Sequence, residues 1–181
     1  MSEIIDYTGR KVWIISDCHF FHSKIILYCN RPFLDEEGNP DVEKMNVTMY
    51  TNWNNTVNDE DIVFYLGDLC IGKNKREMAI IIDENLSGEK YYLVGNHDHE
   101  KMIPNKMIKN RVHYILYKGL KIALSHYPPN TIQWEADILC YGHVHQNSRD
   151  VYNSFNCSVE NINYTPISLD EIIEKLIERN K

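Results

Sequence analysis

The amino-acid sequence predicts an α/β protein, and three patterns support that prediction. Compact runs of β-branched and aromatic residues occupy positions 11–16, 61–66 and 91–94. Segments with apolar residues at helical spacing separate these runs, as in sheets whose parallel strands are joined by helices. Beyond residue 110 the strand-like runs follow one another closely, so the second half adds further strands.

Composition narrows the class of protein. The 181 residues predict one domain, residues 1–181, which is large enough to bury a core. A formal net charge of −7 disfavours non-specific binding to nucleic acid or to an anionic membrane. The sequence has no apolar run of transmembrane length and no signal-peptide pattern. Five cysteines without a Cys-x-x-Cys pair suit a reducing compartment, so we expect a cytoplasmic protein.

Two helices are expected after the first strand. A short one runs from Ser23 to Asn30 and ends before Pro32. The sequence from Asn39 to Asp41 suits the start of a second helix, because it offers a cap, a proline in the first turn and an acid near the positive end of the dipole. The apolar stripe of this helix is Val42, Met45, Met49, Trp53 and Val57.

A third helix is expected over 74–86, between the strands at 61–66 and 91–94. Ser87 and Gly88 end it. Its inward-facing residues are expected to be Met78, Ile81, Ile82 and Leu86.

The second half begins with a predicted hairpin, 112–117 and 120–124. Two more strands are expected at 137–141 and 151–158. The last helix opens with a capping box from Ser168 to Glu171, and Ile167 and Ile172 are placed as a hydrophobic staple.

Polar side chains follow five of the predicted strands, at the point where each strand ends. Any one of them has an ordinary explanation as a surface or core residue. The carboxyl ends of strands in an open α/β sheet converge, however, so five such groups together predict a metal site. In an extended segment Asp17 and His19 also point the same way. The groups are Asp17 and His19, Asp68, Asn96 and His97, His126, and His143 and His145.

The order of these residues resembles the motifs of the calcineurin-like metallophosphoesterases. The resemblance runs from about residue 12 to 145. Within the superfamily, the chain is similar to the small, single-domain bacterial and phage members, and segments 20–22, 30–33 and 45–46 also resemble that subgroup. The motifs read Asp17-Cys18-His19, Gly67-Asp68, Gly95-Asn96-His97-Asp98, His126 and Gly142-His143-Val144-His145.

The resemblance implies a four-layer α/β/β/α sandwich with two divalent metal ions at the carboxyl ends of the strands. Mixed nitrogen and oxygen ligands suit manganese best, and iron, zinc, nickel or cobalt are compatible, whereas magnesium and calcium rarely use imidazole. The implied ligands are Asp17, His19 and His145 for one ion, Asn96, His126 and His143 for the other, and Asp68 between them.

The resemblance also implies roles for His97 and Asp98. His97 would face the substrate and give a proton to the leaving oxygen, while Asp98 would orient His97. A hydroxide between the metals would attack phosphorus in line.

Arg31 and His22 are weaker candidates for substrate binding. Arg31 precedes a proline, and its guanidinium suits a bidentate contact with phosphate. A surface ion pair explains Arg31 equally well. After Gly67-Asp68 the chain reads Leu69-Cys70-Ile71-Gly72, without the acid or arginine that many relatives carry there, which leaves the substrate class open.

These observations predict a metal-dependent hydrolase of phosphodiesters or phosphomonoesters of small or nucleotide-like molecules. One alternative is a nuclease that uses the same site, although the acidic charge and the lack of a basic stripe count against it. Another is a protein-binding scaffold with this fold, which would be expected to lose metal ligands. The sequence leaves the substrate, the native metal and the oligomeric state open.

Overall fold

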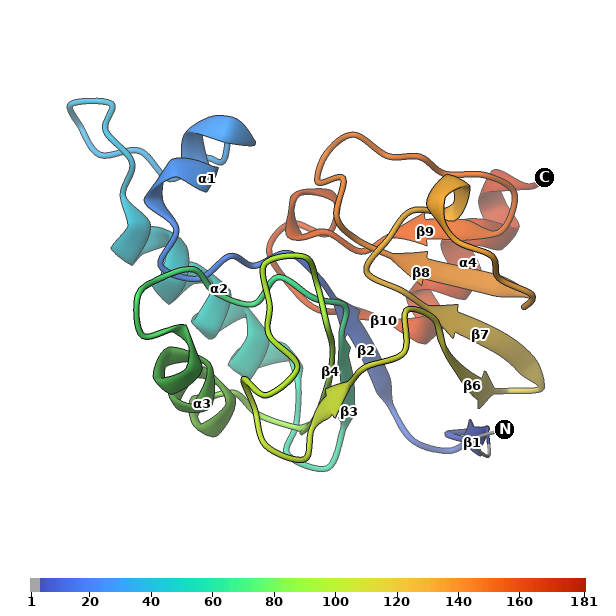
Figure 1. Ribbon diagram of the computed structural model, residues 1–181. Helices are drawn as coiled ribbons and strands as arrows, with labels where there is room; N and C mark the ends of the chain where they lie inside the picture. The colour runs from blue at the N-terminus through green and yellow to red at the C-terminus, as the bar shows by residue number, and fades with distance from the viewer. Residues whose placement is uncertain (1–3) are drawn as a thin grey trace.

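The computed structural model describes residues 4–181. It has an α/β fold with two five-stranded mixed sheets and four α-helices, which confirms the α/β part of the predicted fold class (Figure 1). Within the described residues, no helix is long and apolar enough to cross a membrane.

The first sheet has the strand order β10-β2-β3-β4-β5. Its last four strands in that order pair in parallel, and β10 pairs antiparallel with β2. The strands are β2 (Val12–Ile15), β3 (Ile62–Tyr65), β4 (Glu89–Leu93), β5 (Met107–Ile108) and β10 (Ile167–Ser168).

The second sheet has the order β1-β6-β7-β8-β9. The expected hairpin is β6 with β7, and the other neighbours pair in parallel. The strands are β1 (Ile5–Asp6), β6 (His113–Tyr117), β7 (Leu120–Leu124), β8 (Ile138–Tyr141) and β9 (Ser154–Asn156).

Helices cover the outside of the first sheet. Figure 1 shows α2 and α3 side by side on its outer face, while the second sheet lies toward its other face. Helix α4 contacts β10, β2 and β9, so it packs against both sheets. The helices are α1 (Ser23–Tyr28), α2 (Val42–Thr56), α3 (Lys75–Asn85) and α4 (Leu169–Arg179), with short 3-10 turns at Pro129–Thr131 and Val159–Asn161.

The central strands are buried along their whole length. Every residue of β2, β3 and β8 is buried, which explains why their sequences are continuous apolar runs rather than alternating patterns. Helix α2 contributes Met45, Met49 and Trp53 to the core, and all three belong to the predicted stripe.

The two sheets join through the backbone beside the ends of β2 and β9. The Ser16 amide donates to the Cys157 carbonyl at 3.0 Å, and the Val159 amide donates to the Ser16 carbonyl at 3.1 Å. This link brings the carboxyl ends of strands from both sheets to one place.

Local predictions near the helix ends fared differently. The Ser168 side chain accepts from the Glu171 amide, as the capping box predicts. Helix α2 is capped by Asp41 rather than Asn39, because the Asp41 carboxylate reaches the Lys44 amide.

Ile81 does not face inward and is 50% exposed. The two-residue strands β1, β5 and β10 were not predicted, because so short a segment has no periodicity.

Candidate metal centre

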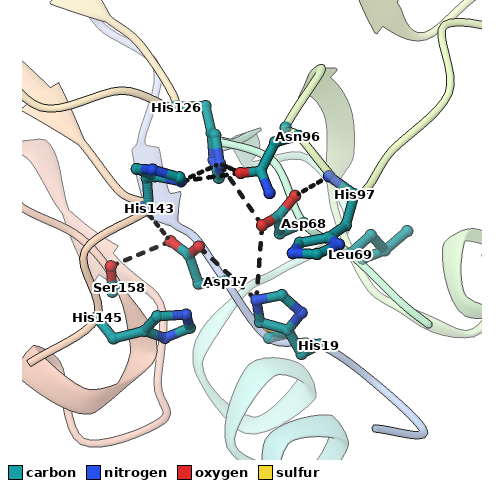
Figure 2. A network of polar contacts seen from close by, with 12 residues as sticks. Asp17, His19, Asp68, Leu69, Asn96, His97, His126, His143, His145 and Ser158 are labelled. Atoms are coloured by element: carbon teal, nitrogen blue, oxygen red, sulfur yellow. Dashed lines mark hydrogen bonds and ion pairs between the residues drawn. The ribbon is translucent and has the colours of Figure 1, made fainter. Parts of the chain in front are cut away.

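Two clusters of three side chains lie at the carboxyl ends of the strands. In each cluster, one potential ligand atom from every residue lies within 4.8 Å of the others. Figure 2 shows these side chains pointing toward one region, although they come from both sheets. The first cluster is Asp17, His19 and His145, and the second is Asp68, His126 and His143.

The carboxylate of Asp68 connects the two clusters. Its Oδ2 lies 3.6 Å from His19 Nε2 and 3.5 Å from His126 Nε2. Its Oδ1 accepts a hydrogen bond from the His97 amide at 2.8 Å. One oxygen therefore fixes the carboxylate, while the other faces both groups of imidazoles.

Asn96 adds an amide oxygen to the second cluster. Its Oδ1 lies 2.8 Å from both His126 Nε2 and His143 Nδ1, and those two nitrogens are 3.2 Å apart. Three polar atoms thus converge on a small volume, which is the donor set that a transition-metal ion of intermediate softness requires.

The loops that carry these residues have unusual backbones. Five candidate ligands have positive φ angles. Residues other than glycine rarely adopt this backbone conformation, and where they do they are often found at functional sites. The prediction that Asp17 and His19 lie in an extended segment is therefore wrong. Strand β2 ends at Ile15, and both residues have a left-handed backbone conformation. The five residues are Asp17, His19, Asp68, His143 and His145.

Two motif glycines allow the loops to approach each other. A Cβ on Gly142 would overlap the side chains of Ser16 and Asp17, and one on Gly95 would overlap Asp68. Any larger residue at either position would push a candidate ligand out of place.

Hydrogen bonds orient several of the candidate ligands. Asp17 Oδ2 accepts from the His143 amide at 2.9 Å and from Ser158 Oγ at 3.0 Å. His126 Nδ1 lies 2.8 Å from the Leu66 carbonyl, so its Nε2 is the atom that faces the cluster.

Other polar atoms of the site are buried without partners. Within residues 4–181, Asp17 Oδ1 and both ring nitrogens of His19 have no hydrogen-bond partner. Leaving such groups unpaired costs about 1–3 kcal/mol each. A bound cation would satisfy Asp17 Oδ1 and one of the two His19 nitrogens, so the residues present fit a metal site.

Burial also shifts the protonation equilibria at the site. It raises the pKa of Asp68 to about 6, against the opposing effect of His126. Burial, together with the neighbouring His145 and Arg31, lowers the pKa of His19 well below its ordinary value. A cation would favour the carboxylate form of Asp68 and the neutral form of His19, which are the forms that bind metal.

His97 lies beside the clusters rather than within them. Its ring centroid is 5.5 Å from that of His19, and the residue is exposed. The expectation that Asp98 orients this ring is wrong, because both carboxylate oxygens of Asp98 are bonded elsewhere. Its carboxylate instead accepts from the amides of Gly95, Asp68 and Leu69, at 3.0, 2.6 and 3.1 Å. Asp98 therefore holds the Asp68 loop against the His97 loop.

Arg31 is deeply buried, so the expectation that it binds substrate is corrected. Its residue is 2% exposed, and its guanidinium donates to the carbonyls of Asp17 and Cys18, both at 2.8 Å. It also donates to Glu160 at 2.7 and 2.9 Å. With its donors used in this way, Arg31 supports the loop that carries Asp17.

Glu160 is the residue that sequence reasoning missed. Its Oε1 lies 2.9 Å from His145 Nδ1, which leaves His145 Nε2 for the first cluster. Burial raises the pKa of Glu160, but the hydrogen bond to His145 and the charge of Arg31 lower it below its ordinary value. The rule that found the other residues applies here too, because Glu160 follows strand β9.

Cys29, His145 and Glu160 form a third group with metal-like geometry. It shares His145 with the first cluster, and Arg31 already neutralises Glu160. We therefore assign this group to the support of His145 rather than to a separate ion.

His22 lies next to the first cluster. Its ring centroid is 5.7 Å from that of His19, and its Nδ1 has no hydrogen-bond partner within the described residues. Burial and the nearby His97 and Arg31 lower the pKa of His22. Unlike Arg31, His22 is only partly buried, so its role in substrate binding stays a prediction.

Comparison with known proteins places the chain in a family. The chain is 44% identical to the uncharacterized protein MJ1445 of Methanocaldococcus jannaschii, over 95% of this chain and 94% of that protein. The chain belongs to the family of MJ1445. Gene 66 protein of Mycobacterium phage L5 is 30% identical over 87 residues, which is 48% of this chain and 39% of that protein. No protein-family model matches the chain.

A solved structure has the same fold as this member of the MJ1445 family. The protein of unknown function AQ665 from Aquifex aeolicus superposes with a TM-score of 0.71, at 28% sequence identity, over 92% of this chain and 99% of AQ665. The α/β architecture with two mixed sheets is therefore shared with an experimentally determined structure.

Replacing Arg31 by alanine tests its supporting role in this family member. The change would remove the cation beside the buried Glu160 carboxylate and leave only His145 as its partner, so we expect the free energy of unfolding to fall by about 3–5 kcal/mol. Denaturant unfolding of the metal-free protein measures this loss. The matched control is Arg10→Ala, which removes an exposed pair with Glu89 and should cost about 0–1 kcal/mol. Equal stability of the two variants would contradict the supporting role.

Proposed function

We propose that this chain is a metal-dependent phosphoesterase of the calcineurin-like superfamily, with that superfamily's four-layer α/β/β/α sandwich. The observation that carries the proposal is the pair of His/Asp clusters connected by Asp68, with the exposed ring of His97 beside them. Helices α2 and α3 outside the first sheet, and the second sheet on its other side, support the proposed architecture.

Seven residues would hold two divalent ions. Asp17, His19 and His145 would bind one, Asn96, His126 and His143 the other, and Asp68 both. Imidazole, carboxylate and amide ligands together favour manganese, iron or zinc over magnesium or calcium. Two such ions supply Lewis acidity and lower the pKa of a bound water, which is the chemistry that phosphate-ester hydrolysis needs.

The side chain of His97 would act on the leaving group. It is exposed and lies next to His19, so it can reach a substrate held at the clusters without being a ligand. Its amide is fixed by Asp68, which positions the ring relative to the site. His97 would give a proton to the leaving oxygen, a contribution that is about 10²–10⁴-fold for general acids.

The surroundings of the site favour small substrates. A surface pocket of about 520 Å³ opens beside His143 and His145 and is lined by Ser148 and Arg149. The guanidinium of Arg149 suits a substrate phosphate. The net charge of −7 disfavours long nucleic acids, so we favour small mono- and diesters over a nuclease activity.

A metal-reconstitution assay tests this function. The protein is stripped with a chelator, then loaded with manganese, nickel, zinc or magnesium and assayed on p-nitrophenyl phosphate and bis(p-nitrophenyl) phosphate. We expect about two ions per chain by elemental analysis, and hydrolysis that depends on them and is strongest with manganese. Metal binding without hydrolysis of any ester would favour a scaffold, and absence of metal binding would overturn the proposal.

A further inference from the structure

A second, larger surface groove lies beside the His97 loop. Its volume is about 740 Å³, and it runs between the first turns of α3 and the segment that follows β4. Such a volume is in the range that holds a drug-sized or nucleotide-sized molecule, about 300–1,000 Å³. The residues that line it include Lys73, Lys75, Arg76, Ile80, Ile81 and Lys101.

The charge of this groove is opposite to that of the whole chain. Four cationic side chains line it, with Glu77 as the single acid, whereas the chain carries −7. Lys73, Arg76 and Lys101 have no ion-pair partner within residues 4–181. Unpaired cations gathered in one concave surface are complementary to an anionic ligand.

The same groove has an apolar wall. Ile81 is 50% exposed on α3, its neighbour Ile80 is partly exposed, and the buried Met102 also lines the groove. Aliphatic and thioether groups pack well against a flat ring, and an arginine can stack on one. An apolar wall beside several cations therefore suits a ligand with both an aromatic ring and a phosphate.

The groove is connected directly to the loop that carries His97. Lys75 Nζ donates to the His97 carbonyl at 2.6 Å, and the Lys75 carbonyl accepts from Cys70 Sγ at 3.4 Å. The start of α3 is thus tied to both the Asp68 loop and the His97 loop. His99, two residues after His97, already lines the groove.

We propose that this groove binds the leaving-group part of the substrate, and that this part is a nucleoside phosphate. The inference rests on the proposed function, because it takes His97 as the proton donor. A proton donor touches the leaving oxygen, so the rest of the leaving group continues past His97 and into the groove. The base packs on Ile80 and Ile81, and the additional phosphate meets Lys73, Arg76 and Lys101.

Binding of a product-like probe to the metal-free protein tests this inference separately from catalysis. Isothermal titration calorimetry in the presence of a chelator compares adenosine 5′-monophosphate with adenosine and with inorganic phosphate. We expect the nucleotide to bind more tightly than either fragment. Lys101→Glu should weaken nucleotide binding by about 10-fold or more, as the loss of a charged hydrogen bond implies. Ile81→Asp should also weaken it.

The matched control is Lys175→Glu, an exposed lysine on α4 that forms an ion pair with Glu171 away from the groove. It should bind the nucleotide as the unchanged protein does. The inference is overturned if the nucleotide binds no better than phosphate, or if Lys101→Glu and Lys175→Glu behave alike. Either result would leave metal-dependent hydrolysis of small esters intact, so failure of the groove and failure of the proposed function can be distinguished.

Discussion

Asp68→Asn is expected to remove bound metal and phosphoesterase activity together. Asp68 Oδ2 lies between His19 and His126, so both clusters depend on its charge. Asparagine keeps the size of the side chain but replaces an anionic oxygen with a neutral amide, which cannot neutralise two adjacent cations. We expect activity to fall by about 10³-fold or more, comparable to losing a principal electrostatic stabiliser.

Elemental analysis after dialysis, together with kcat/KM on bis(p-nitrophenyl) phosphate, measures the two effects. Asp59→Asn is the control, because Asp59 is exposed and lies in the turn before β3. It should retain both metal and activity. If Asp68→Asn keeps two ions and near-normal turnover, Asp68 does not connect the metals.

His97→Gln is expected to reduce activity while leaving the metal content unchanged. His97 is exposed and outside both clusters, so its loss removes no candidate ligand. The expected decrease in kcat is about 10²–10⁴-fold, the range of general acid catalysis. Because a nitrophenolate leaves readily without a proton, the decrease should be largest for alkyl esters.

A matched series of diesters with leaving groups of increasing basicity measures this difference, alongside metal analysis. Equal decreases on good and poor leaving groups would indicate that His97 stabilises charge on phosphorus instead. Loss of metal in His97→Gln would make His97 a ligand and contradict its assigned place outside the clusters.

Residues that are not candidate ligands hold the ligand-bearing loops in place. Arg31 and Glu160 are 129 positions apart, yet together they join the Asp17 loop to His145. Asp98 performs a similar task for the Asp68 loop through three backbone amides. The clusters therefore depend on buried and partly buried charges that are already paired, and these pairs hold the candidate ligands close together.

The sequence by itself determined the features that depend on neighbours along the chain. The apolar runs of β2, β3 and β8 predicted buried strands, and Asp17, Asp68 and His143 follow those strands directly. The carboxyl ends of adjacent strands lie together within each sheet, so the polar groups at strand ends predicted the residues of both clusters, although only the contact of Ser16 with Cys157 and Val159 brings the two sheets' ends together. The Ser168 cap could likewise be predicted, because its partner is three residues away.

Only the tertiary structure decided the features that depend on distant partners. An arginine before a proline gives the same sequence pattern whether its guanidinium binds a substrate or pairs with Glu160. In the folded chain Arg31 is buried and pairs with Glu160. Helical spacing placed Ile81 inward, but nothing within residues 4–181 covers that side of α3, so Ile81 lines a groove instead. Asp98 sits beside His97 in the sequence, yet its carboxylate binds the Asp68 loop because those amides would otherwise be unpaired.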